Sequence, residues 1–112
     1  MSTKALELRR MRASATRACN LLRNLAHEDR LMLLCEISGG EKSVGDLEAL
    51  VGLHQPSLSQ QLGVLRREGL VKTRREGKRI YYRLGSEDAL KVIESLHAVF
   101  CAPSAKKRAG SG

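Results

Sequence analysis

The sequence has few aromatic residues and no long hydrophobic run. Phe, Trp and Tyr together make up 3% of the chain, and tryptophan is absent. No apolar stretch approaches the roughly 20 residues that a helix needs to cross a bilayer. The first residues, MSTKALELRRMRA, are interrupted by charge and lack the apolar core of a signal peptide. We therefore expect a cytoplasmic protein without a membrane partner.

Cysteine is also sparse, and its spacing matches no redox-enzyme motif. The chain contains Cys19, Cys35 and Cys101, which a cytoplasmic location would keep reduced at rest. There is no Cys-x-x-Cys motif and no base paired with a nucleophile, which weakens an assignment as a thiol oxidoreductase. We predict that the protein is not an enzyme and needs no cofactor.

Positive charge is abundant and unevenly placed. The 112 residues are enough for one domain and carry a formal net charge of +8. Residues 66–83 hold eight Lys and Arg against two Glu, a local net charge of +6. Such a balance favours a polyanionic partner, either nucleic acid or an anionic membrane surface. We predict one domain over residues 8–102, between a flexible N-terminus (1–7) and a flexible basic tail (103–112).

Residues 55–71, QPSLSQQLGVLRREGLV, have the pattern of one amphipathic helix. Leu58, Leu62 and Leu65 recur at helical spacing and form an apolar stripe, and Gly69 ends the helix. The opposite surface is short, polar and rich in amides, which is typical either of a solvated helix or of one that enters the major groove. In the groove an amide can pair with adenine and a hydroxyl can bond to several bases. The predicted base-reading residues are Gln55, Ser57, Ser59 and Gln60.

The segments on either side favour the DNA-binding interpretation. Ser43, with Asp46 three residues later, is typical of a helix start, and this short helix leads through a Gly-containing turn into residues 55–71. Residues 70–75 and 79–84 alternate like two strands around a cationic tip. This predicts a winged helix-turn-helix, although charge can also merely protect an edge hairpin. The wing residues that we expect to contact DNA are Arg75, Lys78 and Arg79.

Three further helices complete the prediction, over residues 8–26, 30–38 and 86–101. The first and last have more apolar surface than so small a domain needs internally. We therefore predict a homodimer formed through these two helices, because a two-fold dimer matches an inverted-repeat site in double-stranded DNA.

The segments SVGDLEALVGLHQPSLSQQLGVLRREGLV and TRREGKRIYYRL resemble the ArsR/SmtB family of small dimeric winged-helix repressors. The resemblance covers residues 8–101. It implies a mainly α fold with a small β-hairpin and a ligand-controlled repressor of an inverted-repeat operator. Ser43 and Gly45 stand where arsenic-responsive members have a Cys-x-Cys pair, and the last helix offers only His97 where zinc-responsive members have more ligands. We therefore predict no metal site.

The segments LLCEI and LHAVFC resemble the dithiol branch of this family, the BigR, SqrR and HlyU type, which senses persulfides and oxidants. The resemblance implies that Cys35 and Cys101 are the sensing cysteines and that reactive sulfur species are the inducer. Their coupling through a disulfide or a short sulfur chain would switch off operator affinity. Cys19 has no counterpart in that branch. Two alternatives remain open: a metal-responsive repressor with cysteine ligands, and a constitutive DNA-binding protein.

Overall fold

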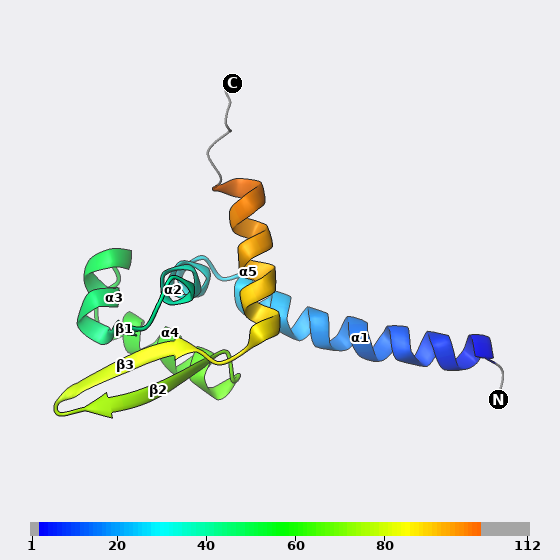
Figure 1. The fold of residues 1–112 in the computed structure, drawn as a ribbon, viewed down its shortest axis with the longest axis horizontal. Coiled ribbons are helices and arrows are strands. Elements are labelled where there is room, and N and C mark those ends of the chain that lie inside the picture. The colour runs from blue at the N-terminus through cyan, green and yellow to red at the C-terminus, as the bar shows by residue number, and fades with distance from the viewer. Residues whose placement is uncertain (1–2, 102–112) are drawn as a thin grey trace, which may run out of the picture.

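Five helices and three strands make up residues 3–101, the part of the chain that this computed structural model describes. Figure 1 shows α1 extending from the body as a long rod, with α5 rising near its inner end and the hairpin projecting on the other side. No helix among these residues is long and apolar enough to cross a membrane. The elements are α1 (Thr3–Leu25), α2 (Glu28–Ser38), β1 (Lys42–Ser43), α3 (Val44–Val51), α4 (Ser57–Arg67), β2 (Val71–Glu76), β3 (Arg79–Leu84) and α5 (Glu87–Phe100).

The core lies where α2 and α4 meet the other elements. The predicted stripe of Leu58, Leu62 and Leu65 is fully buried, which confirms the helical period of α4. It packs in one cluster with Leu33 and Leu34 of α2 and with residues of α3, β2 and α5. Because the stripe is buried, the polar side of α4 faces away from the core.

Local features fix both ends of α3, the first helix of the helix-turn-helix. The Asp46 backbone N–H donates to Ser43 Oγ at 3.1 Å, and the Ser43 N–H donates to the Asp46 carboxylate at 3.2 Å, so the predicted capping box is confirmed. Gly52 follows α3 in the left-handed conformation, with φ of 74°, which favours glycine. The chain can therefore turn at the end of α3, and α4 begins five residues after Gly52, at Ser57.

The sheet contains one strand more than the predicted hairpin. The strand order is β1-β3-β2, and both pairs are antiparallel. Glu76 lies opposite Arg79, so the tip falls at Gly77 and Lys78 as expected. The extra strand, β1, has two residues, which is too short for alternating hydrophobicity to reveal it in the sequence.

Helix boundaries differ most from the predictions at the first helix and at α4. Residues 3–7, which we expected to precede the first helix, form the first turns of α1, because Lys, Ala, Leu and Glu are strong helix formers. The helix predicted from Gln55 to Gly69 is shorter, and α4 spans Ser57–Arg67. The predicted tail, 103–112, lies outside the described residues.

Candidate nucleic-acid interface and cysteine pair

All four predicted base-reading residues are exposed at or near the start of α4. Gln55 lies just before the helix, and its Oε1 accepts hydrogen bonds from the Ser59 N–H at 3.1 Å and from Ser59 Oγ. The N-cap residue, Pro56, makes no side-chain cap bond. Gln55 thus satisfies a backbone donor of the first turn that would otherwise lack a partner. Ser57 and Gln60 present their side chains directly to solvent.

The predicted wing residues Arg75, Lys78 and Arg79 are exposed around the hairpin tip. Lys78 and Arg79 also border an open cleft of about 630 Å³ against the start of α3. Asp46 lies in the same cleft. Its pKa is lowered, mainly by the hydrogen bonds with Ser43 and also by the charges of Arg79 and Lys42. The hairpin tip and the start of α3 therefore line one shared cleft.

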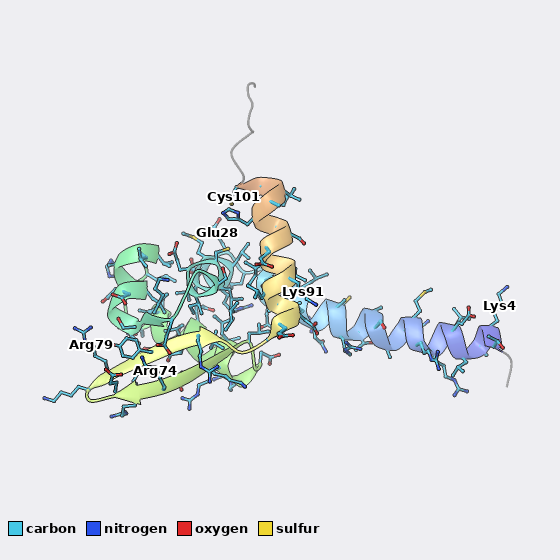
Figure 2. All side chains as sticks on the ribbon, in the orientation of Figure 1. Lys4, Glu28, Arg74, Arg79, Lys91 and Cys101 are labelled. Atoms are coloured by element: carbon cyan, nitrogen blue, oxygen red, sulfur yellow. The ribbon has the colours of Figure 1, made fainter. Side chains whose placement is uncertain are left out.

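Arg74 has a different position from the other wing cations, although it is adjacent in sequence. Its guanidinium donates to both Glu41 carboxylate oxygens, with Nη2 at 2.7 Å, and to Glu76 at 2.7 Å, and it lies 4.5 Å from the centre of the Tyr81 ring. Figure 2 shows Arg74 and Arg79 on the hairpin. The bond from Arg74 lowers the pKa of Glu41, and both carboxylates raise the pKa of Arg74. Arg74 is therefore paired within the protein and holds the wing to the residues before β1.

Cys35 and Cys101 come from α2 and from the C-terminal end of α5. Cys35 is half-buried and lines a cleft of about 410 Å³ between these helices. His97 lines the opposite wall. Cys101 follows one turn later, where its N–H donates to the His97 carbonyl oxygen at 2.8 Å, and it is exposed. All three cysteines are free thiols, and Cys19 lies exposed on α1.

The two predicted sensing cysteines are electrostatically coupled. Burial raises the pKa of the Cys35 thiol, and the negative charges of Cys101 and Glu36 raise it further. Cys35 lies in the cleft that α5 lines, and Cys101 caps the C-terminal end of α5, so the fold places on neighbouring helices two cysteines that are 66 residues apart in the sequence. No group of three or more His, Cys, Asp or Glu within residues 3–101 is arranged to hold a metal ion.

We predict that the alkylation rate of Cys35 rises with pH at a higher midpoint than that of an ordinary thiol. Thiolate is the reactive form, so the midpoint of its rate–pH profile should lie above the ordinary thiol value. In Cys101→Ser the midpoint should fall, because one of the charges that opposes ionisation is gone. Peptide-resolved mass spectrometry measures the Cys35 rate, with Cys19→Ser as the control that should leave the midpoint unchanged. An identical midpoint in Cys101→Ser would contradict the coupling.

Similarity to known proteins agrees with this geometry. Residues 27–73 match the family model described as bacterial regulatory protein, arsR family. The chain is 56% identical over 93 residues to the biofilm growth-associated repressor of Agrobacterium fabrum, covering 83% of this chain and 80% of that protein. The chain belongs to the arsR family. It is a transcriptional regulator of the BigR type, as the sequence resemblance predicted.

Two solved structures show the same fold. The transcriptional repressor BigR from Xylella fastidiosa superposes with a TM-score of 0.77 at 47% identity, covering 91% of this chain and 99% of that one. A homodimeric winged helix-turn-helix DNA-binding domain from Mycobacterium bovis superposes with a TM-score of 0.68 at 31% identity, covering 80% and 83%. The predicted winged helix-turn-helix fold is confirmed.

Proposed function

We propose that this regulator is a homodimeric repressor that binds an inverted repeat in double-stranded DNA and is released when Cys35 and Cys101 become covalently coupled. The observation that carries the proposal is the placement of the two thiols, Cys35 on α2 in the cleft that α5 lines and Cys101 at the C-terminal end of α5. A bond between them would join a helix that packs against α4 to a helix at the edge of the fold.

Dimerisation is supported by apolar side chains that one protomer leaves exposed. On α1, Met11 is 67% exposed, and at the end of α5, Phe100 is 77% exposed. Figure 1 shows both helices extending beyond the packed body. Surfaces of this kind are typical of an interface. The Mycobacterium bovis relative is described as homodimeric. The other large hydrophobic side chains exposed on the two helices are Leu6, Leu8, Leu22 and Val99.

DNA binding is supported by the exposed, polar start of α4 beside the cationic wing. A helix of this kind can place its N-terminal residues against base edges while the wing contacts phosphate or the minor groove. In a two-fold dimer the two copies of α4 would occupy successive major-groove segments, about 34 Å apart. The base-reading candidates are Gln55, Ser57, Ser59 and Gln60, and the backbone-contacting candidates are Arg75, Lys78 and Arg79.

The proposed switch uses a low-molecular-weight persulfide, RSSH. The exposed Cys101 thiolate attacks the terminal sulfur of RSSH, the S–S bond breaks, and RSH leaves after taking up a proton. The Cys35 thiolate then attacks the inner sulfur of the Cys101 persulfide, forming a disulfide and releasing HS⁻. If both cysteines carry persulfides, their condensation gives a trisulfide and H₂S. The persulfide supplies the oxidising equivalent in each case, and added thiol should reverse the coupling.

The proposal is tested by titrating operator DNA with the reduced protein before and after treatment with a persulfide donor. Intact mass measured on the same samples should show loss of two hydrogens for a disulfide, or one added sulfur with loss of two hydrogens for a trisulfide. Affinity should fall in the samples that contain the internal crosslink and recover when thiol is added. Full affinity in a quantitatively crosslinked sample would contradict the switch.

We predict that Gln60→Ala lowers affinity for the preferred DNA site by about 1–3 kcal/mol, as expected when a bidentate base contact is lost. Gln60 is exposed near the start of α4, and no protein hydrogen bond of its side chain is recorded within residues 3–101. Binding to random duplex DNA should change little. Fluorescence anisotropy on both duplexes measures the difference, and an equal loss on both would rule out base reading by Gln60.

A further inference from the structure

One arginine connects three helices beside the proposed recognition helix, α4. Arg30 lies in the first turns of α2 and is half-buried. Its Nε donates to the carbonyl oxygen of Asn24 in α1 at 3.1 Å, and its Nη1 donates to Gln61 Oε1 in α4 at 3.1 Å. Both donors belong to one planar, rigid guanidinium. The two bonds therefore fix the positions of α1 and α4 relative to each other.

A second contact joins the same residue of α1 to the end of α4. Asn24 Nδ2 donates to Glu68 Oε1 at 3.4 Å, and Glu68 is the C-cap residue of α4. Asn24 Nδ2 also donates to the Asn20 carbonyl oxygen at 3.0 Å, which keeps the amide aligned with α1. The recognition helix is thus linked to the last turns of α1 both at its middle and at its end.

Gln61 differs from its neighbour Gln60 in what its side chain contacts. Gln61 is half-buried and its Oε1 accepts from a charged donor, which makes a stronger bond than a neutral donor does. Gln60 is exposed. The two amides are adjacent in the sequence, but one faces α2 and the other faces solvent.

We propose that Arg30 and Gln61 are positioning residues that set the orientation of α4 relative to α1, and through it the cognate preference of the dimer. This inference rests on the proposed function, because it assumes that α4 reads DNA and that α1 joins the protomers. Base contacts require donor–acceptor distances close to 3 Å, so a small rotation of α4 weakens them. Phosphate contacts made by long, exposed side chains tolerate such a rotation. Loss of the Arg30–Gln61 bond should therefore reduce the discrimination between preferred and random DNA more than it reduces general DNA affinity.

The test uses a preferred duplex selected from random DNA with the parent protein. Gln61→Met keeps the side-chain length and the net charge but removes the acceptor. It should lower the ratio of preferred to random affinity about tenfold, the lower range for a lost charge-assisted bond. Arg30→Gln should do the same. The double variant should lose no more than either single one, because the same bond is removed.

Gln61→Glu is the matched control, since it keeps an oxygen acceptor for Arg30. In Gln61→Glu the ratio of preferred to random affinity should stay at the parent value, even if the added negative charge lowers the affinities for both duplexes equally. The salt dependence of random-DNA binding should be unchanged in Gln61→Met, because Gln61 contacts no phosphate.

The outcomes separate this inference from the proposed function. A parent protein with no preferred duplex would contradict the proposed function itself. If the parent has a preferred duplex but Gln61→Met leaves the ratio of preferred to random affinity unchanged, only the positioning role is overturned. The positioning role is also overturned if the two single variants lower the ratio of preferred to random affinity additively in the double variant. The same holds if Gln61→Met lowers the unfolding temperature but leaves that ratio unchanged.

Discussion

Cys35→Ser and Cys101→Ser should each bind operator DNA like the parent and fail to release it when a persulfide donor is added. Serine is close to cysteine in size, and neither thiol takes part in the proposed DNA surface, so reduced-state binding should persist. Each variant lacks one end of the internal crosslink. The parent should lose affinity by about 5- to 150-fold, the range of typical coupling free energies, or by more because the change is covalent.

Cys19→Ser is the matched control for these two variants. Cys19 is also a free, exposed thiol, but it lies on α1, whereas Cys35 lies on α2 and Cys101 at the end of α5. It should release DNA like the parent. Release by Cys35→Ser and Cys101→Ser would show that the signal acts elsewhere, and intact mass would reveal whether Cys19 had been modified instead.

The burial of Cys35 and the exposure of Cys101 suggest an order of events. Burial and the nearby charge of Cys101 disfavour the Cys35 thiolate, whereas Cys101 is exposed. The first attack is therefore assigned to Cys101.

The parts of the fold that depend on short-range periodicity were predictable. The leucines of α4 repeat at helical spacing, and the Ser43–Asp46 capping box lies within four residues, so both could be recognised without tertiary information. Residues 3–7 are helical although chain ends tend to fray, because their strong helix propensity outweighs that tendency.

The contacts that distinguish similar side chains could not be predicted. Arg74 looks like the other wing cations in the sequence, but its partner Glu41 is 33 residues away and becomes adjacent only when the sheet forms. In the same way, Gln61 acquires Arg30, 31 residues distant, whereas Gln60 does not. The cysteine pair could be proposed only from a family resemblance, because two thiols 66 residues apart have no local pattern that reports their proximity.

Replacing Arg75, Lys78 and Arg79 together by Gln should cause the largest loss of general DNA affinity. All three side chains are exposed around the hairpin tip, and no ion pair is recorded for them within residues 3–101, so they are available to phosphate. Each phosphate contact contributes about 0.9 to the slope of log affinity against log salt. If all three make such contacts, the slope should become shallower by about 3 units, counting about one per residue.

The triple variant should lose the most DNA affinity relative to the parent at low salt. Between 50 and 200 mM salt the parent should lose about 40-fold more affinity than the triple variant, from a slope difference of about 2.7 over a fourfold change in salt. The measurement is anisotropy with preferred and random duplexes at four salt concentrations. Both duplexes should respond alike, because phosphate contacts carry no base information.

The control for the triple variant removes the same charge from a distant site. Lys4, Arg9 and Arg10 are exposed on the outer part of α1, and Figure 2 shows Lys4 at the end of the molecule opposite the hairpin. Their triple replacement by Gln lowers the net charge by the same three units, so any effect of overall charge on encounter with DNA is matched. Its salt slope should stay close to that of the parent. Equal slopes in the two triple variants would remove the wing from the interface, since position on the molecule would then have no influence.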